Sequence, residues 1–236
     1  LSMETEYQKG GIAVGASKLR KVYGIETGYP VEALRCVDME VKAGEFVSII
    51  GQSGSGKSTL LNMLGALDVP TEGTVEIGGV DISTLDRNGL AKLRNESIGF
   101  VFQFHYLLPD FTCLENCLVP LMIRYGTPPK TEIERVKNLL VQVGLGDQFR
   151  KRPSEMSGGQ QQRAAIIRAL ANRPHLALAD EPTGNLDTAS TAQVIAILRA
   201  MCGPGSGKSV VVVTHDPGLA AQADRRLHIV DGKVSL

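Results

Sequence analysis

The sequence predicts an α/β fold in which a main sheet is accompanied by an antiparallel β layer and a helical insertion. Residues 46–50 form an apolar run typical of a buried strand, and a glycine-rich loop and a helix expected over 57–67 follow it directly. Residues 73–83 alternate in polarity around Gly78-Gly79, which is typical of a β-hairpin. Helical stretches late in the chain separate three more apolar strands, expected over 176–179, 210–214 and 227–230.

The middle of the chain is predicted to be largely helical. Thr131-Glu-Ile-Glu134 matches the capping-box pattern that opens a helix. Apolar residues then recur at helical spacing as far as Val143, and Gly144 is the expected end. This order of elements predicts a helical insert within an α/β core.

Composition narrows the classes of function. Lys and Arg together number 25, as do Asp and Glu, so no global positive field would hold the chain on nucleic acid or on an anionic membrane. The apolar runs are far shorter than the roughly 18 residues of a spanning helix, so membrane association would require a protein partner. No signal sequence follows the expected native start at Met3, which favours the cytoplasm. Reduced, packed thiols are expected for the four scattered cysteines, Cys36, Cys113, Cys117 and Cys202.

Gly51-Gln-Ser-Gly-Ser-Gly-Lys-Ser58 matches the phosphate-loop pattern GxxxxGK[ST], and its place between a strand and a helix disfavours an ordinary glycine turn. In such a loop, backbone N–H groups surround phosphate oxygens, Lys57 reaches the β- and γ-phosphates, and Ser58 holds magnesium. A similar stretch at 205–209 precedes its strand and has Cys202 in place of the first glycine, so a solvated loop is expected there. The expected nucleotide-binding residues are Gly51, Gln52, Ser53, Gly54, Ser55, Gly56, Lys57, Ser58 and Thr59.

Two carboxylates, Asp180 and Glu181, follow a predicted buried strand, at the end where open sheets bind ligands. A simple strand-end turn is the alternative when this pair is considered alone. Beside a phosphate loop, Asp180 is expected to hold magnesium, and Glu181 to orient or deprotonate the water that attacks the γ-phosphate.

Met156-Ser-Gly-Gly-Gln160 resembles the signature segment of the ABC (ATP-binding cassette) ATPases, with Met156 in place of the usual leucine. The resemblance implies a RecA-like phosphate-loop NTPase core with an antiparallel β layer and an inserted α-helical subdomain. It also implies a head-to-tail homodimer, with ATP at the interface. Ser157 is the expected N-cap of a helix running through Arg168, so that the helix N-terminus can face an anion. The signature residues expected to contact the nucleotide bound to the other subunit are Ser157, Gly158, Gly159 and Gln160.

Other segments match the same family in order. Tyr23 corresponds to the aromatic residue that stacks on adenine, although a surface role is the alternative. Gln103, after a strand expected over 98–102, resembles the Q-loop glutamine that contacts magnesium or the attacking water. Residues 185–187 resemble the D-loop at the dimer seam, and His215 resembles the switch histidine that contacts the γ-phosphate. The resemblance thus implies four catalytic residues, Lys57, Gln103, Glu181 and His215, and three magnesium ligands, Ser58, Gln103 and Asp180.

The resemblance covers nearly the whole chain and implies one ATPase domain over residues 1–236. The core and β layer would occupy about residues 3–103 and 172–236, and the helical subdomain about residues 104–171. The homodimer would bind ATP and Mg²⁺, and no nucleic acid is expected as a partner because the chain has one cassette and no basic surplus.

The stretch from Gln103 to Thr112 is similar to the subfamily that contains the lipoprotein-releasing ATPases LolD, the macrolide exporters MacB and the cell-division ATPases FtsE. The similarity is greatest to the lipoprotein-releasing type. It implies integral-membrane partners of the LolC/LolE, MacB or FtsX type and a peripheral location at the cytoplasmic face of the inner membrane. The implied task is lipoprotein release or a related mechanotransmission, with control of cell-wall hydrolases and drug or peptide export as alternatives. The apolar residues of 104–111 would contact the membrane subunit, although core packing explains some of them.

Overall fold

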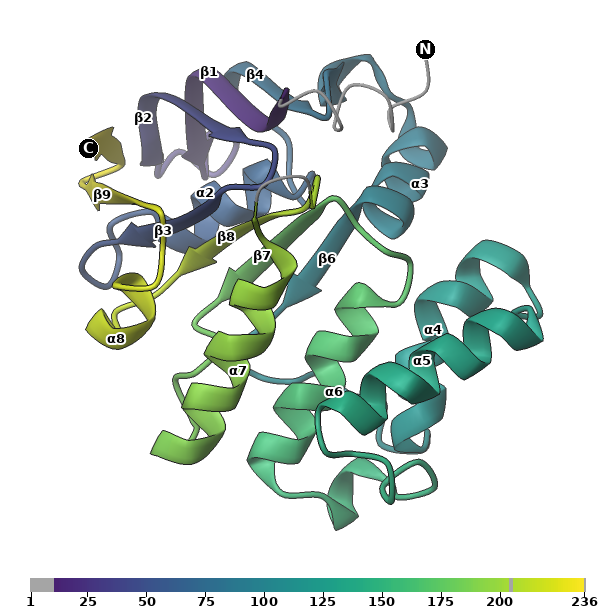
Figure 1. Ribbon diagram of the computed structural model, residues 1–236. Coiled ribbons are helices and arrows are strands. Elements are labelled where there is room, and N and C mark those ends of the chain that lie inside the picture. The colour runs from purple at the N-terminus through teal and green to yellow at the C-terminus, as the bar shows by residue number, and fades with distance from the viewer. Residues whose placement is uncertain (1–10, 204–205, 236) are drawn as a thin grey trace.

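The computed structural model describes residues 11–203 and 206–235, so the expected start at Met3 and the first residue of the 205–209 stretch lie outside the described residues. Two sheets enclose helix α2, as Figure 1 shows. The first sheet is antiparallel, has the order β2-β1-β4-β5, and comprises β1 (Ile12–Tyr23), β2 (Val31–Lys42), β4 (Glu72–Ile77) and β5 (Val80–Asp81).

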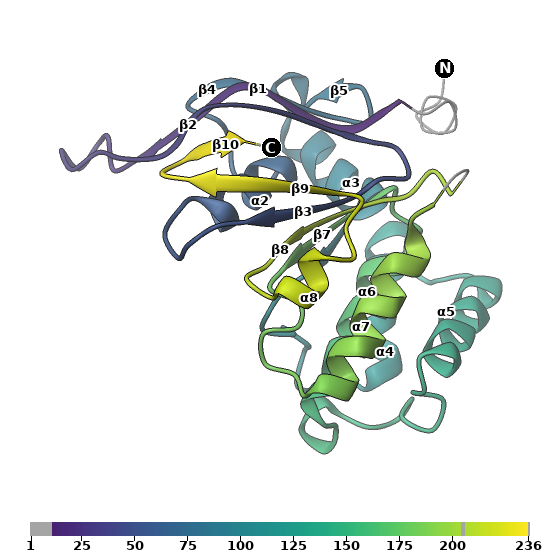
Figure 2. The ribbon, with the colours of Figure 1, turned by 60° about the vertical axis from the view of Figure 1, so that its left-hand side comes forward.

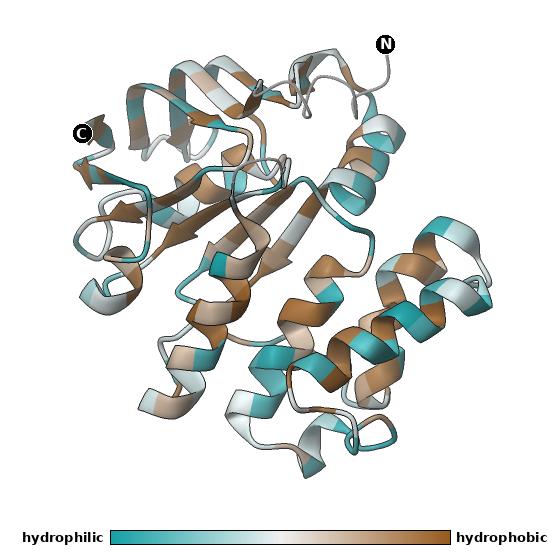
Figure 3. Cartoon of the chain, in the orientation of Figure 1, coloured by the Kyte–Doolittle hydropathy of each residue, from teal (hydrophilic) through white to brown (hydrophobic). Residues whose placement is uncertain are grey.

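The second sheet has the order β10-β9-β3-β8-β7-β6, and β10 is its antiparallel strand. Its strands are β3 (Phe46–Ile50), β6 (Ile98–Val101), β7 (Leu176–Asp180), β8 (Ser209–Val213), β9 (Arg225–Val230) and β10 (Lys233–Ser235). The predicted α/β class with an additional antiparallel layer is therefore confirmed. Strands β3, β6, β7 and β8 are hydrophobic along most of their length in Figure 3, as expected for strands covered on both faces, whereas β9 alternates between buried and exposed residues.

The helices divide between the two sides of the parallel sheet. The α-helices are α2 (Lys57–Leu64), α3 (Arg87–Ser97), α4 (Cys113–Tyr125), α5 (Lys130–Gln142), α6 (Gly158–Leu170), α7 (Thr188–Met201) and α8 (Pro217–Ala220). Two short 3₁₀ helices, Ile82–Thr84 and Pro153–Glu155, complete the set among the described residues. None of the helices in the described ranges is long and apolar enough to cross a membrane.

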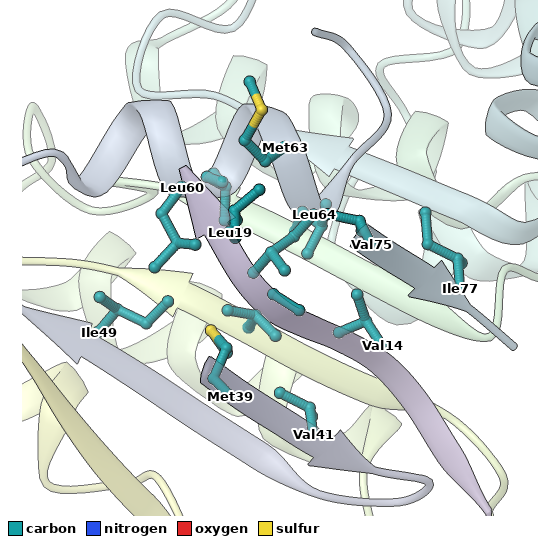
Figure 4. Packing of buried hydrophobic residues seen from close by; sticks show 14 of the residues in the cluster. Val14, Leu19, Met39, Val41, Ile49, Leu60, Met63, Leu64, Val75 and Ile77 are labelled. Carbon is teal, nitrogen blue, oxygen red and sulfur yellow. The ribbon is translucent and has the colours of Figure 1, made fainter. Parts of the chain in front are cut away.

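Three buried clusters hold these elements together. The largest lies between the two sheets, where Leu60 and Leu64 of α2 meet Val14 and Ile77 of the antiparallel layer and Ile49 of β3 (Figure 4). A second cluster packs α6 and α7 on the opposite face of the parallel sheet. The third joins α4, α5 and α6, which lie beside one another away from the antiparallel layer (Figure 2). Helix α6 contributes to both of the last two clusters, so it connects the helical layer to the sheet.

Two predicted helix ends are wrong. Helix α2 stops at Leu64 rather than at residue 67, because Gly65 is the C-cap and Ala66 has a φ of 53°, outside the helical range. Helix α5 begins at Lys130 with Pro129 as its N-cap and no side-chain cap, so the capping box predicted at Thr131 does not form. Thr131 is already inside the helix, where its hydroxyl cannot serve as the cap.

The cysteines provide a test of the packing. Cys113 and Cys117 are fully buried, whereas Cys36 is exposed. Burial raises the pKa of the Cys202 thiol to about 11. Because the thiolate is the reactive form, iodoacetamide at pH 8 should alkylate only Cys36 in the native protein and all four thiols after unfolding. Mass spectrometry of the native Cys36→Ser variant should show almost no alkylation, and equal labelling of two or more native thiols would contradict this packing.

Candidate nucleotide-binding site

The predicted chemical residues lie together because parallel strands bring their carboxyl ends to one edge of the sheet. Ile49 of β3 and Asp180 of β7 both pair with Val213, the last residue of the intervening β8. Val101 ends β6 beside Ala179 of β7. The loops that leave these four strands carry the phosphate loop, Gln103, Glu181 and His215, and they therefore start side by side.

The phosphate loop turns tightly between β3 and α2. Gly54 and Gly56 have φ values of 78° and 105°, which glycine adopts without the steric cost that a Cβ would bring. A side chain on Gly56 would also lie 2.6 Å from the Ala33 carbonyl oxygen. The N–H of Gly232 donates to the carbonyl of Ser55 (3.0 Å), which fixes the loop to the β9–β10 turn. The loop is thus held against β2 and the β9–β10 turn, with the N-terminus of α2 behind it.

Lys57 and Asp180 place opposite charges at the two sides of this loop. The Lys57 Nζ donates to the carbonyls of Gly51 (2.8 Å) and Gln52 (2.7 Å), which keeps the ammonium group over the loop. Burial raises the pKa of the Asp180 carboxyl, while a hydrogen bond from the Ser58 hydroxyl and the charge of Lys57 partly oppose that rise. An ionised carboxylate is therefore held in a place that costs free energy unless a cation joins it.

Glu181 is held at the end of β7 in an unusual backbone conformation. Its φ is 46°, which costs a residue other than glycine roughly 1–3 kcal/mol. Its N–H donates to the Val213 carbonyl at 2.9 Å. The carboxylate lies 2.8 Å from His215 Nδ1 and accepts a 3.3 Å hydrogen bond from the Thr214 hydroxyl. These contacts fix the carboxylate in the lining of the pocket, in direct contact with the exposed imidazole of His215.

Gln103 extends toward the same place from the end of β6. A Cβ on Gly184 would lie 3.0 Å from the Gln103 Nε2, so the glutamine side chain packs on the turn that follows Glu181. Strand β6 ends at Val101, one residue earlier than predicted, and Gln103 therefore lies in the loop. A side chain at position 184 would require Gln103 to shift by a few tenths of an ångström.

A pocket of about 670 Å³ collects most of the predicted residues. The predicted residues that line the pocket are Gly51, Ser53, Gly54, Gly56, Lys57, Ser58, Thr59, Gln103, Asp180, Glu181 and His215. Gln52 and the buried Ser55 belong to the loop but not to the lining. Sequence reasoning missed Val31, Glu32, Ala33, Arg35, Asp231 and Gly232, which also line the pocket. They come from β2 and the β9–β10 turn, and no local motif marks them.

Tyr23 lies at the end of β1 and does not line this pocket. Its hydroxyl donates to Asp68 at 2.9 Å, and the ammonium group of Lys21 lies 4.8 Å from its ring centroid. Burial, followed by the hydrogen bond to Asp68, raises the pKa of the Tyr23 phenol, whereas a contact with Thr59 at the start of α2 acts in the opposite direction. The ring is thus near the phosphate-loop helix, and stacking on adenine stays a prediction.

The signature residues lie away from the pocket of their own chain. Ser157 is the N-cap of α6 as predicted, and it forms a capping box in which Gln160 N donates to Ser157 Oγ (3.3 Å) and Ser157 N donates to Gln160 Oε1 (2.9 Å). A side chain on Gly158 would meet open space, whereas one on Gly159 would lie 2.9 Å from the Cβ of Ser190 in α7. Gly158 therefore leaves the helix end accessible, and Gly159 packs it against α7.

The donor set fits a small hard cation. The Ser58 hydroxyl and the Asp180 carboxylate are in contact beside the phosphate loop, and oxygen ligands of this kind suit Mg²⁺. Within residues 11–203 and 206–235, no group of three or more His, Cys, Asp or Glu side chains forms a metal cage. A site with one carboxylate suits a cation that also binds substrate phosphates.

The raised pKa of Asp180 predicts a conflict between stability and function. A carboxyl whose pKa is higher in the folded state destabilises the fold as pH rises above its unfolded pKa, and the whole cost is present above its folded pKa. Without metal, Asp180→Asn should therefore raise the thermal unfolding midpoint at pH 7. The same substitution should abolish the Mg²⁺ dependence of ATP binding.

Asp224→Asn is the matched control with the opposite sign. Arg199, at 2.7 Å, is the main cause of the lowered pKa of Asp224, which also accepts from the Phe46 N–H. Asp224 therefore stabilises the fold at pH 7, and this contribution is lost as pH falls through its folded pKa. The two variants should shift the midpoint in opposite directions. A lower midpoint for Asp180→Asn would contradict the account.

Comparison with known proteins shows the family of this chain. The sequence matches the ABC transporter family over residues 34–184. The lipoprotein-releasing system ATP-binding protein LolD of Aquifex aeolicus is 51% identical, over 93% of this chain and 94% of that protein. The macrolide export ATP-binding/permease protein MacB of Nitrosomonas europaea is 46% identical over 92% of this chain but only 32% of that protein.

A solved structure supports the same assignment. The dimeric bacterial ABC transporter cassette MJ0796 superposes with a TM-score of 0.86 at 42% identity, and the match covers 94% of this chain and 97% of that one. A second structure of that cassette, in a post-hydrolysis state with ADP and phosphate, matches equally well. The pocket at the carboxyl ends of the parallel strands, the separate signature helix and these relatives together identify the chain as an ABC transporter ATPase, a nucleotide-hydrolysing member of the ABC transporter family.

Proposed function

We propose that two copies of this chain form two shared sites, each with the phosphate-loop pocket of one copy and Ser157, Gly158, Gly159 and Gln160 of the other. The observation that carries the proposal is the separation within one chain: the hydrolytic groups converge on the pocket, whereas the accessible N-terminus of α6 lies elsewhere. Such an N-terminus attracts anions. The dimeric cassette at 42% identity supports this arrangement.

The residues predicted from the sequence have separate proposed tasks in binding and hydrolysis. Lys57 exchanges its contacts with two loop carbonyls for the β- and γ-phosphates. Ser58, Asp180 and Gln103 would hold Mg²⁺, which would supply positive charge to neutralise the charge that develops on the phosphates. Glu181 accepts a proton from the attacking water, and His215, in contact with that carboxylate, lies where it can contact the γ-phosphate. Tyr23 provides an aromatic face for adenine near the start of α2.

We further propose that the chain drives integral-membrane subunits, of the LolC/LolE type or of the related MacB or FtsX types, for lipoprotein release or a related task. The match to LolD spans nearly the full length of both chains, which favours this reading. In that assembly the chain lies at the cytoplasmic face of the inner membrane, attached through its partner. Residues 104–171 form the helical subdomain of a single ATPase domain, and the third buried cluster supports this division.

Drug or peptide export is the second candidate, because MacB-type proteins share 46% identity with the chain. Those relatives are about three times as long, and this chain corresponds to a third of their length. Control of cell-wall hydrolases, as in FtsE-like regulators, is a further alternative implied by the subfamily. The membrane protein that copurifies with the chain distinguishes these tasks.

The segment after Gln103 is the proposed contact with the membrane partner. It exposes four large apolar side chains, Phe104, Tyr106, Leu108 and Phe111, whose exposed fractions are 63%, 65%, 43% and 36%. Such a gathering of aromatic and aliphatic side chains is typical of an interface. The segment is not loose, since Arg168 of α6 donates to the carbonyls of His105 (2.8 Å) and Tyr106 (2.6 Å). A force on this segment would therefore be transmitted to α6, the helix that begins at the signature residues.

Tyr106→Asp tests this contact. A buried carboxylate would oppose docking, and aspartate tolerates the φ of 47° at this position. We expect loss of copurification with the membrane subunits and loss of ATPase stimulation in reconstituted vesicles. Leu107→Asp should act in the same direction, and it should also lower the thermal unfolding midpoint because Leu107 packs against the third buried cluster.

Ile123→Asp is the matched control, because Ile123 is exposed to a similar extent (69%) but lies near the end of α4. It should retain both copurification and stimulation. Retained coupling in Tyr106→Asp would count against the proposed contact.

A further inference from the structure

Gln162 of α6 is a buried polar side chain that joins three separate segments. It is 1% exposed. Its Nε2 donates to the carbonyls of Pro182 (2.8 Å) and Phe102 (3.3 Å), and its Oε1 lies 2.5 Å from His105 Nδ1. The helix layer, the end of β6 and the end of β7 therefore meet at one amide group.

The chemistry of this group allows one arrangement of protons. Two carbonyl oxygens face the same end of the amide, so that end must be the NH₂ group, which has two donors. The other end is then the carbonyl oxygen, and His105 must donate to it from a protonated Nδ1. Every polar atom of the Gln162 side chain is thus satisfied, and replacement of the amide leaves buried carbonyls without a donor.

The two carbonyls belong to residues directly beside the proposed hydrolytic groups. Phe102 precedes Gln103, and Pro182 follows Glu181. Glu181 is in a left-handed conformation (φ 46°) that persists only when its surroundings fix it. The bond to Pro182 is the contribution of α6 to that turn.

We propose that Gln162 is a positioning residue for hydrolysis: it sets the spacing between the Glu181 turn and the Gln103 segment, and His105 holds its amide in place. It does not line the nucleotide pocket. The inference rests on the proposed roles of Glu181 and Gln103. Helix α6, whose N-terminus carries the signature residues, would thus position the hydrolytic groups of its own chain as well as contact the nucleotide of the other copy.

A positioning role predicts an effect on kcat rather than on ATP binding. A displacement of about 1 Å can cost a catalytic site 10²-fold in rate. The printed hydrogen bonds of the Gln162 side chain go to Phe102, Pro182 and His105 and not to the phosphate loop, so Lys57 and the loop N–H groups should keep their places. Gln162→Met, similar in volume and without hydrogen-bonding groups, should lower kcat by at least about tenfold and change the KM for ATP by less than about twofold.

Gln161→Met is the matched control from the neighbouring position on the same helix. The Gln161 Nε2 donates to Pro153 (2.9 Å) and Met156 (3.1 Å), so its bonds stay within the helical layer. Its kcat should remain within about twofold of wild type. Thermal melts of both variants check that each is folded at the assay temperature.

Rescue at His105 gives an independent readout. His105→Asn keeps an N–H donor near the place of Nδ1 and should retain most of the activity, whereas His105→Phe removes the donor and should lower kcat in the same direction as Gln162→Met. Combining His105→Phe with Gln162→Met should cost less than the sum of the single effects, because both break one network.

Equal kcat values for Gln162→Met and Gln161→Met would overturn the inference, as would a loss of ATP affinity as large as the loss of kcat. Equal activity of His105→Asn and His105→Phe would remove the role of His105. A wild-type protein without ATP hydrolysis would overturn the proposed function and this inference with it, so the two failures are distinguishable.

Discussion

The parallel pairing of β3 with β8 and of β8 with β7 is the constraint on which the site depends. Its register brings the end of β3, Asp180 and the loop after Val213 to one edge of the sheet. Strand β6 adds the Gln103 segment to the same edge. Because all these strands are buried on both faces, a shift in register would cost core packing as well as catalytic geometry. The hydrophobic core and the active geometry are therefore fixed by the same hydrogen bonds.

Two residues of the site, Asp180 and Glu181, are in locally unfavourable states that the surrounding fold must stabilise. Burial disfavours the ionised form of Asp180, and Glu181 has a backbone conformation rare for its residue type. The surrounding contacts come from β8, from the loop after it and from α6. Such tension between stability and function is expected where a carboxylate must remain ready for a cation and a water molecule. Helix α6 contributes to two buried clusters, so it is suited to transmit a displacement between them.

Sequence patterns predicted the elements whose signals are local. The strand, loop and helix around Gly51, the N-cap at Ser157 and the strands before Glu181 and His215 are all present. Features that depend on distant neighbours were missed. Pocket residues such as Ala33 and Gly232 approach the phosphate loop only through tertiary packing, and the capping box at Thr131 fails because the N-cap is Pro129, two residues earlier. The hydrogen bonds of Gln162 join three segments that are distant in the sequence, so no local pattern could predict them.

The most direct test of the shared site is the association state of Glu181→Gln in ATP and Mg²⁺. Wild type should hydrolyse ATP and elute mainly as a monomer. Glu181→Gln should bind ATP without hydrolysing it and should elute as a dimer with two ATP per pair in size-exclusion chromatography with light scattering. Replacing Ser157 with Arg in the same variant should abolish that dimer. A Glu181→Gln protein that binds ATP and remains monomeric, or that hydrolyses it at the wild-type rate, would contradict the account.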